Sequence, residues 1–285
     1  MKFLWVFLLL LACNKKNQDI EDYRKDLMEI NNNSRHWAKR IGLSATTEAD
    51  IGGSVRDAGL FDGILCMSGE KESEKAILAS QGPDGRFWRS PSHVGNVEEH
   101  SYSRDMTVGT LGCLMHIGAK EQAMRWGEYI ESQGNRVCPR DQGSCDLNIA
   151  SPLWSVFAYS WEKLGLPLSN AMKTHKHNET ALVFTVPTTK GYATHLIGVE
   201  VLILQKAGVK KTHTALALQK KEPENPFYAY LTGNWNRAAE LTVRYCPKTR
   251  PAVRRDWIFQ RDAPYDPNRS SGWECIAMTN FLLRD

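Results

Sequence analysis

The sequence predicts an all-α fold that is built from pairs of helices, one apolar and one amphipathic. Apolar residues recur at spacings of three and four along most of the 285-residue chain, which is the period of helices packed on one side. Short breaks that contain glycine separate these stretches, as at Ser68-Gly69 and at Gly208. With 42% hydrophobic residues, the chain can form the core that a domain of this length needs.

The clearest pair is expected at Asp105–Ile117 and Lys120–Ser132. After its first residue, the first segment contains only one ionisable side chain, His116, and a helix that is apolar all round is a buried helix. The second segment carries a single apolar face that includes Trp126 and Ile130. The two segments therefore predict an inner helix followed by an outer, half-exposed helix.

The other pairs follow in order along the chain. The first pair is interrupted at Gly69, and the third begins with a helix whose aromatic residues Trp154, Phe157 and Trp161 are spaced by three and four. The fourth pair is interrupted at Gly208, and the fifth has the weakest pattern. Apolar helices are expected at Ile51–Met67, Asp105–Ile117, Ala150–Leu164, Tyr192–Ala207, Phe227–Leu231 and Gly272–Leu283. Amphipathic helices are expected at Glu72–Ser80, Lys120–Ser132, Leu168–Thr174, Thr212–Lys220 and Asn236–Tyr245.

The last apolar helix, Gly272–Leu283, needs a partner, and a helix at Ile20–Ile30 can supply it by closing a ring. Alternating buried and amphipathic helices are what an inner and an outer ring of helices requires. We therefore expect a six-hairpin α/α toroid as a single domain over residues 20–285. An irregular all-helical domain is the alternative, because periodicity does not establish that a ring closes.

The N-terminal residues predict export. One lysine precedes a long apolar run, as in a signal peptide, and the run is shorter than the roughly 20 residues that a spanning helix needs. Leu10-Leu11-Ala12-Cys13 resembles the bacterial lipobox, in which the cysteine becomes the lipidated first residue. We expect a signal peptide over residues 1–12, a tether over residues 13–19, and a lipid anchor on Cys13 in the bacterial cell envelope, on its periplasmic side or at the cell surface. An ordinary secretory signal is the alternative.

Six of the seven cysteines remain when Cys13 is set aside. Export permits disulfides, and the short loop between Cys138 and Cys145 makes these two the expected pair. Cys113 and Cys275 lie in apolar helical stretches and are interpreted as buried thiols. No CxxC pair is present, so the sequence gives no support for a zinc site of the usual spacing, and no cofactor is expected.

Several classes of function lack sequence support. The net charge of +4 is small and no long basic run is present, so nucleic acid is not an expected partner. The chain has no GxSxG, no GxxxxGK[ST] and no convincing GxGxxG motif, which argues against the usual serine hydrolases and nucleotide-binding proteins. The oligomeric state is left unassigned.

Three aspartates are candidate catalytic groups. Asp84 lies near Trp88 in a long polar and aromatic loop, although it also fits a side chain that closes its own turn. Asp105 begins the apolar helix after Ser103, where an acidic residue is equally explained by helix capping and the helix dipole. Asp62 is the only acid within the apolar stretch from Leu60 to Leu65, and such a carboxyl is either paired or functional.

Aromatic, basic and histidine side chains of the loops and helix starts are the candidate ligand-binding residues. Planar rings mixed with charged groups suit a polyhydroxylated ligand, although they also suit a well-bonded surface loop. For His195, a satisfied core histidine is the alternative. The candidates are Trp88, Arg89, Tyr102, Arg104, His195, Trp257 and Arg261.

The rhythm of helical hairpins, the aromatic loops and the acid-bearing helix start SRDM at residues 103–106 resemble the six-hairpin toroid superfamily, which includes many glycoside hydrolases and polysaccharide lyases. The resemblance covers about residues 50–285 and assigns no catalytic residue. It implies a carbohydrate ligand and, as the main expectation, hydrolysis of a glycosidic bond by two carboxyls, here Asp84 and Asp105 with Asp62 in reserve. The alternatives are a non-catalytic surface lipoprotein that binds glycan or a protein, and a lyase that uses Tyr102 or His195 as base with Arg104 near a uronate.

Overall fold

The computed structural model describes residues 21–36, 58–96, 102–137, 152–176, 192–210, 212–246 and 272–284. Regular structure in these ranges is helical, apart from isolated bridge residues at Gln81, Phe87 and Arg136, so the all-α expectation is confirmed. No helix in the described ranges is long and apolar enough to cross a membrane. Several residues of interest lie outside these ranges, namely Cys13 with the expected signal and tether, Cys138, Cys145, Trp257 and Arg261.

Most helices begin and end within a few residues of the predicted bounds. The N-terminal helix continues beyond the predicted Ile30, and the predicted starts at Ile51 and Ala150 lie outside the described residues. A helix at residues 21–36 comes first. It is followed by α2 (Ala58–Met67), α3 (Lys71–Ala79), the short 3-10 helix η1 (Pro91–His93), α4 (Arg104–Ile117), α5 (Lys120–Ser132), α6 (Pro152–Leu164), α7 (Asn170–His175), α9 (Tyr192–Lys206), α10 (Thr212–Lys221), α11 (Pro226–Leu231), α12 (Trp235–Tyr245) and α13 (Trp273–Arg284).

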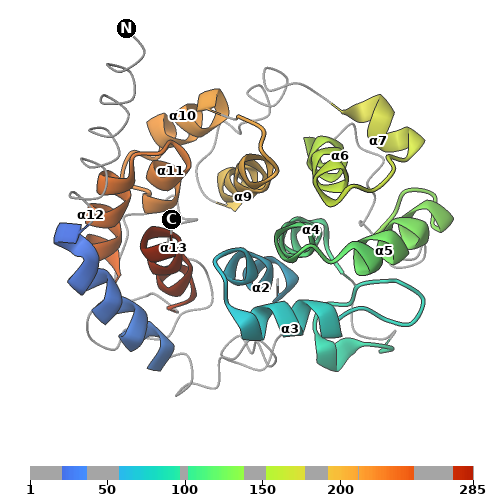
Figure 1. The fold of residues 1–285 in the computed structure, drawn as a ribbon, viewed down its shortest axis with the longest axis horizontal. Helices are drawn as coiled ribbons and strands as arrows, with labels where there is room; N and C mark the ends of the chain where they lie inside the picture. Colours follow the sequence, from blue (N-terminus) through green and yellow to red (C-terminus); the bar gives the residue numbers. More distant parts are fainter. Residues whose placement is uncertain are drawn as a thin grey trace, which may run out of the picture.

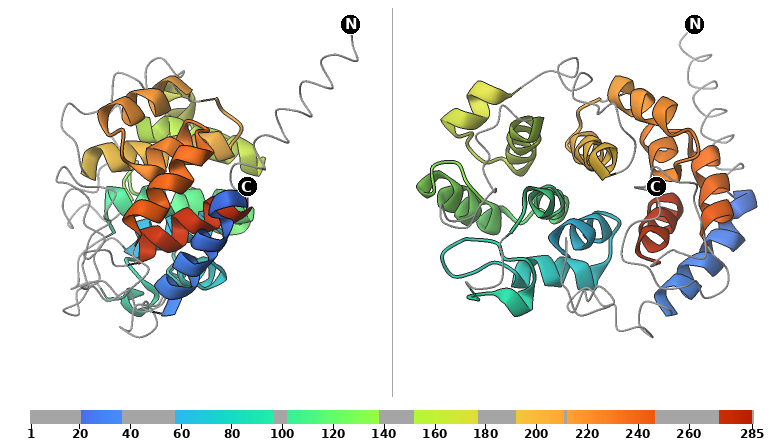
Figure 2. Two further views of the ribbon diagram at one scale, coloured as in Figure 1. Left: turned by 90° about the vertical axis from the view of Figure 1, so that its left-hand side faces the viewer. Right: turned by 180° about the vertical axis from the view of Figure 1, so that it is seen from behind.

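Apolar and amphipathic helices occupy different places in the molecule. In Figure 1, α2, α4, α6, α9 and α13 surround the centre, whereas α3, α5, α7, α10 and α12 lie further out. The view from behind in Figure 2 shows the same arrangement. Among these inner helices, α2 contacts α4, α4 contacts α6, α6 contacts α9, and the last helix, α13, contacts α2. The short helix α11 links α9 to α13, because it contacts α9 and its Tyr230 ring stacks on Phe281 of α13 at 5.1 Å. The alternation along the sequence therefore corresponds to an inner and an outer position in space.

The inner helices run parallel to one another. A disulfide joins Cys66 and Cys113 near the C-terminal ends of α2 and α4. Near the end of α9, Gln205 donates a hydrogen bond of 2.7 Å to the carbonyl of Leu231 at the end of α11. Arg284, which ends α13, donates to the backbone carbonyl that follows α2. A Cβ atom on Gly112 of α4 would lie 2.9 Å from the side chain of Ile203 near the end of α9. The helices α2, α4, α9, α11 and α13 therefore end together on one side of the molecule and begin together on the other.

Glycine ends each of these inner helices within the described ranges, with the exception of α13. The residue after the glycine donates to the carbonyl five positions earlier, as Val209 does to Leu204 at 2.9 Å. Positive φ is readily adopted only by glycine, and it allows the chain to turn back within a few residues. The glycines are Gly69, Gly118, Gly165, Gly208 and Gly233, with φ between 70° and 94°.

The interface between α2 and α4 is formed by glycines. A Cβ atom added to Gly63 would lie 2.1 Å from the backbone carbonyl carbon of Gly109. One added to Gly109 would lie 2.3 Å from the carbonyl oxygen of Gly59. The two backbones are therefore in direct contact, and the Cys66–Cys113 disulfide lies one turn further along the same interface.

The interpretation of Cys113 and Cys275 as buried thiols is wrong. Cys113 is bonded to Cys66, and Cys275 is bonded to Cys246 at the end of α12. The partners are 47 and 29 residues apart in the sequence. Each pair depends on which helices become neighbours, which the local pattern around one cysteine does not reveal.

A polar cluster joins the N-terminal helix to α13 and to the start of α3. Asn31 donates to Thr279 Oγ1 at 2.6 Å and to Asn280 Oδ1 at 3.0 Å. Arg35 donates to both carboxylate oxygens of Glu70, and Asn280 donates to the same carboxylate at 2.6 Å. The N-terminal helix therefore supplies the partner of the last helix, as the sequence predicts.

Burial alone would raise the pKa of Glu70, but the hydrogen bonds from Arg35 and Asn280 outweigh it and hold the pKa below its ordinary value.

Candidate functional site

Asp105 is the second residue of α4, on the side of the molecule where the inner helices begin. The Ser103 hydroxyl accepts a hydrogen bond of 3.2 Å from the N–H of Met106, so Ser103 is the helix cap that the sequence predicts. Asp105 itself is half-buried. Its position satisfies the helix-start explanation and also leaves its carboxyl within reach of solvent.

Asp62 lies on the neighbouring inner helix and deeper in the molecule. It is 3% exposed, and the contacts between α2 and α4 show how far along the helix axis it lies. Gly59 lies opposite Met106, and Gly63 lies opposite Gly109. Because a helix rises 1.5 Å per residue, Asp62 lies about 5 Å further along the helix axis than Asp105, roughly one turn. The two carboxyls are thus on adjacent helices near the same end.

Asp84 has a different setting. Its side chain is exposed, and its carboxylate accepts a hydrogen bond of 3.1 Å from the N–H of Arg86, as expected of an aspartate that closes its own turn. Trp88 lies close to Asp84. A Cβ atom added to Gly82 would lie 2.8 Å from the indole nitrogen of Trp88 and 2.9 Å from Asp84 Oδ1. Arg125 of α5 donates to the Gly82 carbonyl at 2.7 Å. The described contacts therefore place Asp84 and Trp88 beside α5.

Tyr102 and His195 are core residues. The Tyr102 ring is 1% exposed and lies 6.1 Å from the ring of Trp126. Its hydroxyl donates to the Met106 carbonyl at 3.3 Å, and burial raises the pKa of Tyr102 above its ordinary value. His195 is fully buried against Phe227, with 5.7 Å between the ring centroids. Burial lowers the pKa of His195 to about 3, so the ring is neutral at pH 7.

Of the remaining candidates, Arg89 is half-buried. Arg104 is the first residue of α4, and its side chain lies outside the described part of the structure. The ring of Trp88 is 8% exposed and is covered by the guanidinium of Arg86, which lies 4.0 Å from the ring centroid.

A buried polar cluster at the starts of α9 and α11 was missed by the sequence analysis. Thr194 donates to Glu222 Oε1 at 2.9 Å, and Asn225 donates to Glu222 Oε2 at 3.1 Å. The Asn225 side chain also caps α11 by accepting from the N–H of Phe227 at 3.0 Å. The Asn225-Pro226 dipeptide is a recognisable helix-start signal, whereas the burial of Glu222 depends on tertiary contacts.

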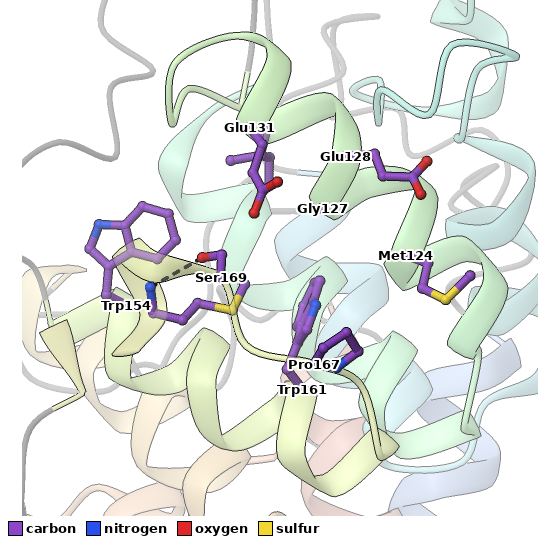
Figure 3. Close-up of a pocket in the computed structure, with 10 residues that line it drawn as sticks. Met124, Gly127, Glu128, Glu131, Trp154, Trp161, Pro167 and Ser169 are labelled. Atoms are coloured by element: carbon purple, nitrogen blue, oxygen red, sulfur yellow. Dashed lines mark hydrogen bonds between the residues drawn. The ribbon is translucent and has the colours of Figure 1, made fainter. Parts of the chain in front are cut away.

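A pocket of about 200 Å³ lies between α5, α6 and the segment that leads into α7 (Figure 3). None of the candidate site residues whose side chains the structure describes lines it. Its lining residues are Met124, Gly127, Glu128, Ile130, Glu131, Trp154, Trp161, Pro167, Ser169 and Met172.

The pocket combines aromatic rings with two carboxylates. Trp154 and Trp161, two turns apart on α6, are 3% and 4% exposed, and both were expected to be core residues. Glu128 and Glu131 are exposed and are separated by three residues on α5, so they lie on one face of that helix. In Figure 3 the carboxylate of Glu131 points toward the side of the pocket that carries Ser169.

Gly127 keeps this pocket open. A Cβ atom at this position would lie 3.2 Å from the edge of the Trp161 ring, so any larger side chain would enter the space beside the indole. Among the described residues, no group of three or more His, Cys, Asp or Glu side chains is arranged to hold a metal ion.

Comparisons with protein-family models, with curated proteins and with solved structures found no match for the chain.

Proposed function

We propose that this chain is an exported, lipid-anchored α/α-toroid protein that binds a carbohydrate and hydrolyses a glycosidic bond where its inner helices begin. The parallel inner helices, the alternation of inner and outer positions and the contact between α13 and α2 support a closed ring. Fold alone does not specify an activity. The proposal therefore depends on the groups that the inner helices present at this end.

The observation that carries the proposal is the placement of Asp62 and Asp105 on adjacent inner helices. Glycoside hydrolysis uses one carboxyl to protonate the leaving oxygen and a second one to activate water or to attack the sugar. Asp62 is assigned to proton donation because it is the more buried of the two carboxyls. Asp105 is closer to solvent and suits the ionised role. Asp84 ranks third, because its carboxylate accepts from its own turn.

A mutational series tests this assignment. The full chain is assayed on a panel of polysaccharides, and release of reducing ends is measured for the wild type and for Asp62→Asn, Asp105→Asn and Asp84→Asn. A general acid or base contributes a factor of about 100 or more to the rate. Asp62→Asn and Asp105→Asn should therefore each reduce turnover by at least that factor. Asp22→Asn in the exposed part of the N-terminal helix is the control and should leave turnover unchanged.

The outcomes separate the alternatives. Glycan binding by the wild type without turnover of any substrate contradicts hydrolysis and favours the non-catalytic lipoprotein. Release of unsaturated products identifies a lyase. Full activity of Asp105→Asn alongside an inactive Asp84→Asn would reverse the ranking of the carboxyls.

The proposed location outside the cytoplasm has independent support. The Cys66–Cys113 and Cys246–Cys275 disulfides are of a kind that forms and persists in oxidising compartments. If Cys13 carries the lipid anchor, Cys13→Ser should move the protein from the membrane fraction to the soluble fraction and abolish labelling by a fatty acid. Unchanged membrane association of Cys13→Ser would contradict a lipid anchor at this residue.

A further inference from the structure

The pocket between α5 and α6 is separate from the residues assigned to hydrolysis. Its lining comes from α5, α6 and the chain around α7, whereas Asp62 and Asp105 belong to α2 and α4. A ligand in this pocket would therefore not contact the proposed catalytic carboxyls. The pocket therefore needs an explanation of its own.

The inner wall of the pocket is aromatic and apolar. Trp154 and Trp161 flank Phe157, whose ring centroid is 5.7 Å from Trp154 and 5.3 Å from Trp161. Met172 closes the wall on the side of α7, where it is 3% exposed. Packing of this kind fixes the indole rings, so the wall keeps its shape whether or not a ligand is present.

The outer rim is acidic. Glu128 and Glu131 are the only charged residues among the ten that line the pocket, although the chain as a whole carries a net charge of +4. The hydroxyl of Ser169 accepts a hydrogen bond of 3.2 Å from the N–H of Met172, which occupies part of its bonding capacity. Two carboxylates, with no basic residue among the described lining residues, favour a ligand with positive charge.

We propose that this pocket binds a small organic cation, with its ammonium group between the rim carboxylates and the indole rings of Trp154 and Trp161. Aromatic rings attract ammonium groups through the negative potential of their faces, and the carboxylates add direct charge complementarity. The volume of about 200 Å³ is below the usual range for drug-sized ligands, which limits the ligand to a compact one. The proposal does not rest on the hydrolytic activity.

Choline and its uncharged carbon isostere, in which a tert-butyl group replaces the trimethylammonium group, are the probes. Both are titrated into the full chain, and binding is followed by calorimetry and by tryptophan fluorescence. We expect choline to bind with a dissociation constant in the millimolar range or below. The isostere should bind at least about tenfold more weakly, because it lacks the attraction to the rings and to the carboxylates.

Variants place the binding in this pocket. The double variant Glu128→Gln and Glu131→Gln should weaken choline binding by about tenfold or more, and Gly127→Leu should abolish it by filling the space beside Trp161. Glu121→Gln, an exposed acid on the same helix that does not line the pocket, should bind choline as the wild type does. Circular dichroism melts show whether each variant is folded.

Three results would overturn the proposal. They are absence of choline binding to the folded wild type, equal affinity for the uncharged isostere, and unchanged affinity in the folded double glutamine variant.

Discussion

Two helix interfaces in this molecule are built on opposite principles. At the α2–α4 interface, Gly59, Gly63 and Gly109 bring the backbones into direct contact. At the α5–α6 interface, the Trp126 and Phe157 rings are 5.4 Å apart, and Trp161 lies against the single glycine Gly127. The first interface leaves no space for a side chain, whereas the second one borders a pocket of about 200 Å³.

The difference shows how side-chain size decides where a helical protein has room for a ligand. Helix axes are usually 8–10 Å apart, depending on the residues at the contact. Glycines on both helices reduce this separation to its limit and form a rigid interface. When large rings on one helix face a mixture of large and small residues on the other, gaps remain that no protein atom fills.

The largest expected effect is at the closest contact. Gly63→Ala places a Cβ atom 2.1 Å from the carbonyl carbon and oxygen of Gly109, and backbone atoms cannot move aside without separating the two helices. We expect the free energy of unfolding to fall by at least about 4 kcal/mol, measured by urea denaturation.

Gly59→Ala is the matched control for that variant. Its added Cβ would lie 3.0 Å from Met106 Cβ and 3.2 Å from Thr110 Oγ1. These distances require shifts of only a few tenths of an ångström, so the loss should be roughly 1–3 kcal/mol. A loss below about 1 kcal/mol for Gly63→Ala would show that α2 and α4 are not held in backbone contact.

The disulfide at the same interface should contribute less. Replacing both Cys66 and Cys113 by serine opens a loop of 47 residues. The chain-entropy description gives an upper value of about 4 kcal/mol for this loop, and the typical loss for a disulfide is about 3 kcal/mol. Because the glycine contacts remain, the variant should still unfold in one cooperative transition. Replacing Cys246 and Cys275, which are 29 residues apart, should cost about 0.4 kcal/mol less in the chain-entropy description. Loss of cooperative unfolding in the first variant would mean that the disulfide, and not the glycines, holds this interface.

A third, polar contact between helices extends the comparison and depends on pH. Glu70→Gln removes the charge that Arg35 and Asn280 bind, and we expect a loss of about 2 kcal/mol at pH 7. The folded pKa of Glu70 lies below its ordinary value of 4.5, so its contribution is complete above pH 4.5. That contribution disappears as the pH falls through the folded pKa.

The stability difference between wild type and Glu70→Gln should therefore shrink below pH 4.5. Glu72→Gln removes an exposed pair with Lys75 and should change stability by less than about 0.5 kcal/mol at either pH. A difference for Glu70→Gln that is the same at pH 7 and at acidic pH would contradict the linkage.

The helices were predictable because their signals are local. Ser103 caps α4 as expected, and the outer helix α5 has the predicted bounds, because periodicity and caps depend on residues within a few positions of each other. The partners of Cys113 and Cys275 were not predictable, because each bond joins helices that become neighbours only in the folded protein. The pocket was missed for the same reason. Trp154 and Trp161 were recognised as an apolar face, but the sequence does not show which helix packs opposite them.

The smallest expected effect completes the comparison. Gly127→Ala makes the same chemical change as Gly63→Ala, also inside a helix, where alanine is favoured over glycine by about 1 kcal/mol. Its Cβ would meet only the edge of the Trp161 ring, at 3.2 Å, which requires an adjustment of only a few tenths of an ångström. We therefore expect the stability to change by no more than about 1 kcal/mol in either direction, measured by the same urea denaturation as for Gly63→Ala. Each variant gains the same helix propensity, and the two differ only in what the new methyl group contacts. If both alanine variants lose similar stability, the size of the side chains around the glycine does not distinguish the two interfaces.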